Sequence, residues 1–275
     1  MVDSEEQAVK SELPAFGSSL GDEIVTVVVG TEQKNYRLHK ALLVHHSEYF
    51  CNALKAPWKE AEDGVVPLTD VDVEVFDLFA RWIYTQKIPY KIYGPMWDHQ
   101  GNGRNYSLTE ISWLYLKAFV FGDRFLAQIF RSAAQQEFSH LSKTYGRFMT
   151  EINDAAIIQY AFENVPAQHP LLQQIADNYR HQMCYWEDRR NRYGMSKLTK
   201  QCYEPFSISA QRSLPIDFLL RVNKGIHQYG LDLSRQDERS REHCYFEHAS
   251  DKEKKKCGKL HVEYDEHMGY GFWNP

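Results

Sequence analysis

An apolar, β-branched run near the start of the chain constrains its fold more than any other stretch. Residues 24–29 have the sequence Ile-Val-Thr-Val-Val-Val, and Gly30 ends the run. The run is too short for a buried helix, and β-branched residues favour strands, so it predicts a buried strand. The polar residues 30–35 predict a turn, and residues 36–38 predict a second, shorter strand that returns beside the first.

From His39 the apolar spacing becomes helical. Residues three and four apart predict one helix that ends at Pro57, with a buried face of Leu42, Leu43, His46, Phe50, Ala53 and Leu54. A third short strand is expected over residues 65–68, after the Asp63-Gly64 turn. Asp70 or Asp72 then caps a helix whose buried face contains Val75, Phe76, Phe79, Ala80 and Ile83. A hairpin, a helix, a strand and a helix predict an α+β core.

The order and spacing of these blocks resemble a BTB/POZ domain. The blocks that carry the resemblance are residues 23–29, 36–43, 46–50, 58–61, 65–68 and 76–85. The chain is most similar to the single-BTB proteins abundant in fungi, in which the domain precedes a helical region. The resemblance implies a small sheet covered by a cluster of helices. Two positions depart from the family pattern: Glu23 stands where Asp is usual, and Glu48 where Pro is common.

The rest of the chain predicts an all-α region followed by a charged end. Helix-start signals are the capping box Ser107–Glu110, Asp154 or Asn153, and Pro170. We expect a flexible N-terminal arm over residues 1–20, the BTB/POZ domain over 21–141, a helical C-terminal region over 150–230, and a charged, partly disordered tail over 231–275.

Composition excludes several classes of protein. The formal net charge is −5, which argues against nucleic acid as the default partner. Five cysteines without a CxxC pair fit a reducing compartment better than a disulfide framework. The first 20 residues have no secretory-signal pattern, and no apolar run has membrane length. We therefore expect an intracellular protein, in the cytoplasm or nucleus, that does not bind membranes.

Glu23 and Lys40 are the first candidate partner-binding pair. In BTB domains the matching acid and base form a charged pocket at the dimer surface, so the resemblance implies that place for this pair. If both are buried, removing one would cost roughly 3–5 kcal/mol. If both are exposed, their pairing contributes less than about 1 kcal/mol. The neighbouring His39 is expected to be a hydrogen-bonded scaffold residue.

Trp58 and Glu60 are the second candidate pair. Adaptors that recruit cullin-type ubiquitin ligase scaffolds carry a hydrophobic-x-Glu triplet at the matching place, and an apolar anchor with a nearby carboxylate suits a partner helix. The alternative is that Trp58 covers the core of its own domain. An adaptor also needs a substrate-recruiting domain, and none is recognisable in this sequence.

Two further sequence patterns are typical of other functions. Two C-x3-H pairs, formed by Cys244, His248, Cys257 and His261, could supply four zinc ligands if each pair shared a helix face. The alternative is a charged helix with incidental Cys and His, in which Lys254–Lys256 would repel a cation. A basic and aromatic stretch over residues 180–200 could contact nucleic acid, and its alternative is a solvated surface. We predict no metal and no nucleic-acid partner.

The sequence contains none of the catalytic motifs that we considered, which were a nucleophile elbow, a His-Glu-x-x-His motif, a P-loop and paired carboxylates in an apolar setting. We therefore predict a protein that is not an enzyme and uses no cofactor and no small-molecule substrate. Its expected function is protein–protein interaction: self-association as a homodimer through the BTB surface, and adaptor activity for a cullin-type ubiquitin ligase. The alternative is a dimeric scaffold in transcriptional or chromatin regulation.

Overall fold

The computed structural model describes residues 23–55, 57–88, 106–145, 154–193, 212–229, 243–265 and 270–273. The expected N-terminal arm, residues 1–20, lies outside these ranges. The chain divides into two compact units. Unit 1 contains the described residues up to Lys87 together with Phe121–Arg131, and unit 2 contains the other described residues. This division crosses two long helices, and the expected domain end at residue 141 stays a prediction.

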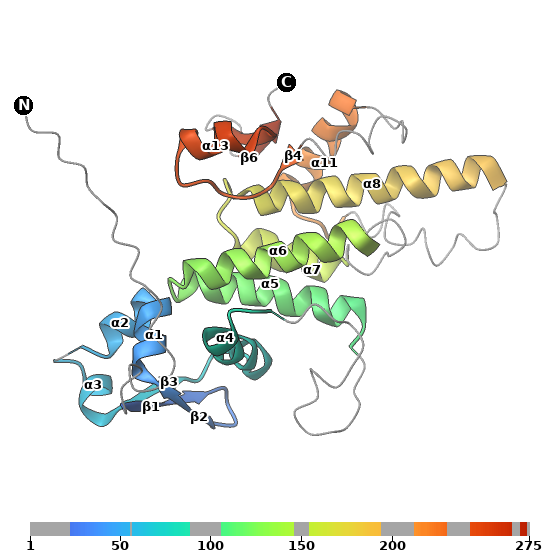
Figure 1. Cartoon of the computed structure of the whole chain (residues 1–275). Coiled ribbons are helices and arrows are strands. Elements are labelled where there is room, and N and C mark those ends of the chain that lie inside the picture. Colours follow the sequence, from blue (N-terminus) through green and yellow to red (C-terminus); the bar gives the residue numbers. More distant parts are fainter. Residues whose placement is uncertain are drawn as a thin grey trace, which may run out of the picture. The chain divides into compact units, whose positions relative to one another are not determined.

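A three-stranded sheet organises unit 1 (Figure 1). Strand β1 (Ile24–Val29) lies in the middle, antiparallel to β2 (Lys34–His39) and parallel to β3 (Val65–Leu68). Val27 pairs with Tyr36 on one side and with Val66 on the other. Because side chains alternate along a strand, Val25, Val27 and Val29 are all buried on one face. The predicted hairpin and third strand are confirmed.

Between β2 and β3 the chain forms α1 (Lys40–His46), α2 (Glu48–Ala53) and α3 (Lys59–Asp63), and after β3 it forms α4 (Val73–Thr85). Asp72 caps α4, because its side chain accepts a hydrogen bond from the Glu74 amide at 2.9 Å. Together with the sheet they give the α+β architecture that the sequence predicts.

The prediction of one continuous helix between His39 and Pro57 is wrong, because Ser47 divides it. Ser47 has extended backbone angles, φ −146° and ψ 120°. Its hydroxyl accepts a hydrogen bond from the Phe50 amide at 3.2 Å and donates one to the Phe125 carbonyl at 2.6 Å. Glu48 is the first residue of α2, so this helix begins directly after Ser47 with Glu where the family commonly has Pro.

Aromatic side chains form much of the core of unit 1. The Phe79 ring lies 5.0 Å from that of Phe121 and 5.1 Å from that of Phe130, and Phe121 stacks on Phe125 at 4.4 Å. Each of these rings is almost fully buried. Contacts of this kind add stabilisation beyond the apolar area that they bury.

Most of the described part of unit 2 is helical. Its main helices are α5 (Leu108–Arg124), α6 (Gln128–Tyr145), α7 (Ala155–Asn164), α8 (Pro170–Tyr193) and α11 (Ile216–Tyr229), and both units share α5 and α6. The three predicted starts are confirmed: the Ser107–Glu110 capping box precedes α5, Asp154 caps α7, and Pro170 opens α8. Phe218 of α11 packs its ring 5.1 Å from Tyr179 of α8.

A second small sheet lies where the sequence predicts a partly disordered tail. It has the order β4-β5-β6, formed by β4 (His243–Cys244), β5 (Leu260–Asp265) and β6 (Tyr270–Trp273). Helix α13 (Asp251–Cys257) connects β4 to β5, which run parallel. The charged side chains of α13 are exposed, so a charged composition here accompanies an ordered helix. Among the described helices, none combines the length and apolar character that crossing a bilayer requires.

Candidate functional site

Glu23 and Lys40 form the expected ion pair in unit 1. The Lys40 ammonium donates to Glu23 Oε1 at 2.7 Å, and the Lys40 backbone amide donates to the Glu23 carbonyl at 2.9 Å. The Glu23 side chain is 69% exposed, so this pair belongs to the surface class within a single chain and contributes less than about 1 kcal/mol. Its place in a dimer contact stays a prediction.

His39 has the scaffold role that the sequence predicts. Its Nδ1 lies 2.8 Å from the Tyr84 hydroxyl, and its backbone amide donates to the same oxygen at 3.2 Å. Because the hydroxyl oxygen already accepts the amide proton, its own proton can be donated to Nδ1. These two bonds tie the end of β2 to α4.

Trp58 lies on the surface of unit 1, directly before α3. Its side chain is 61% exposed, so it does not cover the core of its own domain as the alternative interpretation requires. Glu60, in the first turn of α3, is half-buried. Burial raises the pKa of the Tyr49 hydroxyl, and the negative charge of Glu60 raises it further. An exposed indole and a carboxylate therefore lie two residues apart.

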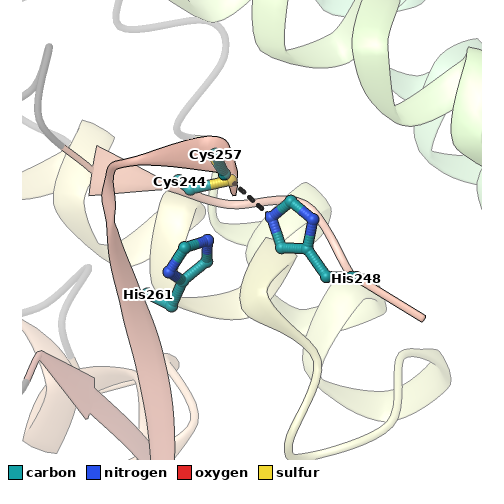
Figure 2. A group of neighbouring side chains, drawn as sticks. All are labelled: Cys244, His248, Cys257 and His261. Atoms are coloured by element: carbon teal, nitrogen blue, oxygen red, sulfur yellow. Dashed lines mark hydrogen bonds between the residues drawn. The ribbon is translucent and has the colours of Figure 1, made fainter. Parts of the chain in front are cut away.

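Cys244, His248, Cys257 and His261 converge in unit 2 (Figure 2). One potential ligand atom from each residue lies within 4.8 Å of the other three. The Cys244 sulfur is 3.3 Å from His248 Nε2, and the rings of His248 and His261 meet nearly edge to face, 4.7 Å apart. From the sequence, we expected the four residues to meet at one site only if each C-x3-H pair shared a helix face. In the structure only Cys257 is helical.

The tertiary fold, rather than a helix, brings the two pairs together. Strand pairing places Cys244 of β4 directly opposite His261 of β5. Cys257 is the last residue of α13, and Gly258 follows it in the left-handed region at φ +66°, which turns the chain back towards His261. Burial raises the pKa of the Cys244 thiol, whereas burial and the neighbouring His248 lower the pKa of His261.

The segment between the first two of these residues is anchored to the helices of unit 2. The Tyr245 carbonyl accepts a hydrogen bond from the Gln135 side-chain amide at 2.6 Å, and the Tyr245 hydroxyl donates to Asp177 at 3.0 Å. Glu247 lies 3.4 Å from His169 Nε2. Sequence reasoning did not find these anchors, because the partners are separated by 68 to 110 residues for Tyr245 and no local pattern links them.

The basic and aromatic stretch offers less surface than its composition suggests. Arg180 is only 2% exposed, and its guanidinium lies 3.6 Å from the Asp177 carboxylate. This guanidinium is therefore buried inside unit 2 and cannot contact nucleic acid. The remaining basic side chains of the stretch, from Arg189 to Lys200, lie outside the side chains that the structure describes. The described part of the stretch therefore adds no argument for nucleic-acid binding.

Comparison with known protein families finds that residues 19–98 match the BTB/POZ domain. No curated protein matches the chain. The matched residues include the β2-β1-β3 sheet and helices α1 to α4, in the order that the resemblance implies. The N-terminal part of this chain is therefore a BTB/POZ domain, followed by a helical C-terminal region.

Proposed function

We propose that this protein binds a cullin-type ubiquitin ligase scaffold through Trp58 and Glu60, and that its BTB/POZ domain also self-associates. A BTB/POZ domain is a protein–protein interaction module, so binding another protein is the general function of unit 1. The observation that supports the finer proposal is the 61% exposure of Trp58 beside Glu60.

An exposed tryptophan is a strong candidate for an interface anchor. Its side chain buries roughly 150–250 Å² when a partner covers it, and tryptophan is enriched among the residues that dominate binding energy. Glu60 stands two positions further on and offers a carboxylate for a basic or amide group of the partner. This apolar-then-acidic arrangement is the one that the resemblance associates with cullin recruitment.

Self-association is supported by the Glu23–Lys40 pair. The pair is formed within one chain, so both charges are already partly neutralised before a second copy approaches. Covering the exposed Glu23 carboxylate in a dimer would then cost less than burying an isolated charge. A dimer that binds no cullin would instead favour the scaffold in transcriptional or chromatin regulation.

Binding to a purified cullin N-terminal region tests the docking proposal. We expect Trp58→Ala to weaken the affinity by about 30-fold, since hot-spot truncations cost at least about 2 kcal/mol. Glu60→Arg should weaken it by tenfold or more. Isothermal titration calorimetry would give both dissociation constants, and an unchanged melting temperature would show that the variants fold.

Two matched controls make the test specific. Glu62→Arg changes the same charge in the first turn of the same helix, and Ile129→Ala removes an apolar side chain of unit 1 that is 63% exposed. Both should bind like the unchanged protein. Failure of the unchanged protein to bind at micromolar concentration, or equal losses in Glu60→Arg and Glu62→Arg, would overturn the proposal.

A further inference from the structure

The four-residue cluster of Cys244, His248, Cys257 and His261 has the dimensions of a tetrahedral metal site. In a zinc site with bonds of about 2.3 Å to sulfur and 2.0–2.1 Å to nitrogen, neighbouring ligand atoms lie about 3.3–3.8 Å apart. The 3.3 Å between the Cys244 sulfur and His248 Nε2 already falls in this range. Because all four atoms lie within 4.8 Å of one another, small side-chain movements would complete the tetrahedron.

An imidazole nitrogen in the cluster has no hydrogen-bond partner among the described residues. His261 Nε2 is buried and makes no hydrogen bond. A buried polar atom of this kind costs free energy unless something satisfies it, and a metal ion bound by its lone pair would do so. The Nε2 atom of His248 points at the Cys244 sulfur. This arrangement also favours one ion bound by both residues over separate hydrogen bonds.

Charge also suits the cluster to a divalent ion. Two thiolates and two neutral imidazoles bound to Zn²⁺ give a complex with no net charge, so the lysines of α13 do not repel it. The backbone of Phe246 makes a hydrogen bond to the Cys244 sulfur. A hydrogen bond from a backbone amide to a ligand sulfur is the kind of outer contact that orients metal ligands.

We propose that Cys244, His248, Cys257 and His261 together bind one Zn²⁺ ion as a structural site. Two sulfur and two nitrogen donors are a set that zinc prefers, and four protein ligands leave no position for a reacting water. The ion would join β4, α13 and β5 to the loop that holds Tyr245 and Glu247 against the helices of unit 2. The site goes beyond the docking function proposed for unit 1.

The zinc content of the purified protein tests this site. The protein would be purified in a reducing buffer without added metal, and its zinc content would be measured by inductively coupled plasma mass spectrometry. We expect one zinc per chain, and loss of most of it in Cys257→Ser and in His261→Asn. After removal of zinc with a chelator, Co²⁺ should bind with the visible bands of a tetrahedral ion and a sulfur-to-cobalt absorption band.

Matched variants separate metal binding from folding. Cys51→Ser and Cys184→Ser remove cysteines outside the cluster and should keep the full zinc content. Cys257→His retains four donors, so it should bind zinc where Cys257→Ser does not, while losing intensity in the sulfur-to-cobalt band. Trace zinc without a tetrahedral cobalt spectrum in the unchanged protein, zinc that persists in Cys257→Ser, or a Cys244–Cys257 disulfide that remains in reducing buffer would overturn the proposal.

Discussion

At the scale of single residues, His46 is a titratable group inside an apolar core. Its ring lies 4.9 Å from that of Trp82, and its Nε2 accepts from the Gln86 side-chain amide at 3.1 Å. Its Nδ1 is buried and makes no hydrogen bond among the described residues. Burial, with a smaller effect from neighbouring His45, lowers the pKa of His46 to about 4. A proton on this ring would remove the acceptor that Gln86 uses.

His46 therefore makes stability depend on pH in a defined direction. Its pKa is about 4 in the folded protein and near 6.5 in the unfolded chain, so the unfolded chain takes up the proton first. The free energy of unfolding is therefore unaffected by His46 above pH 6.5, and it decreases by roughly 2–3 kcal/mol as the pH falls towards 4. Urea unfolding at a series of pH values should show a smaller loss for His46→Gln than for the unchanged protein.

His45→Gln is the control for this prediction, because it removes the adjacent, half-buried histidine and leaves His46 in place. That variant should keep most of the pH dependence. An unfolding free energy of His46→Gln that falls between pH 6.5 and 4 as steeply as that of the unchanged protein would show that another group is responsible.

At the scale of elements, the reversal between α5 and α6 depends on a close backbone approach. A Cβ atom added at Gly122 would lie 2.8 Å from the Cα, Cβ and N atoms of Arg131. The Ala127 amide donates to the Gly122 carbonyl at 2.7 Å, and Leu126 has a positive φ of 52°. The need for glycine at position 122 therefore comes from a residue nine positions further along the chain.

Gly122→Ala should destabilise unit 1 by more than about 2 kcal/mol, because the Cα and N atoms that it meets are backbone and the Cβ is fixed to them, so none can move aside alone. Gly64→Ala is the matched control. Gly64 also has a positive φ, 64°, but a Cβ there would meet no atom within 4 Å, so we expect a cost of only about 1 kcal/mol. Urea unfolding would measure the loss of unfolding free energy in each variant. An equal loss in the two variants would contradict the close approach of Gly122 to Arg131 as the cause.

At the scale of the whole molecule, the molar mass of the protein in solution tests self-association directly. Light scattering over a tenfold range of concentration should give the mass of a dimer for the unchanged protein. Lys40→Glu places two acids together and should shift the mass to that of a monomer, whereas Lys40→Glu combined with Glu23→Lys restores an opposite-charge pair and should restore the dimer.

The Lys34–Asp77 ion pair provides the control for the mass measurement. It spans 3.0 Å on the surface of the same unit, so Lys34→Glu disturbs a comparable pair elsewhere and should leave the dimer intact. A monomer at every concentration for the unchanged protein would exclude the self-associating part of the proposed function. Cullin docking through Trp58 and Glu60 would still be tested separately.

Local signals were enough to predict much of unit 1 and several helix starts in unit 2. The β-branched run predicts β1 because β-branched side chains favour strands. The side chains of Asp72, Asp154 and the Ser107–Glu110 pair satisfy helix-end amides within four residues. The predicted resemblance to a BTB/POZ domain is confirmed for residues 19–98, since it depends on the order of such local blocks.

Contacts between distant residues decided the rest. Ser47 ends α1 because its hydroxyl reaches Phe125, 78 residues away, and no neighbouring residue signals that bond. Trp58 is exposed, whereas other aromatic rings fill the core of the domain. The residue spacing around Trp58 does not show which of these rings are buried. The sequence alone shows two C-x3-H pairs, whereas only the pairing of β4 with β5 brings Cys244 and His261 opposite each other and gives the four residues a common centre.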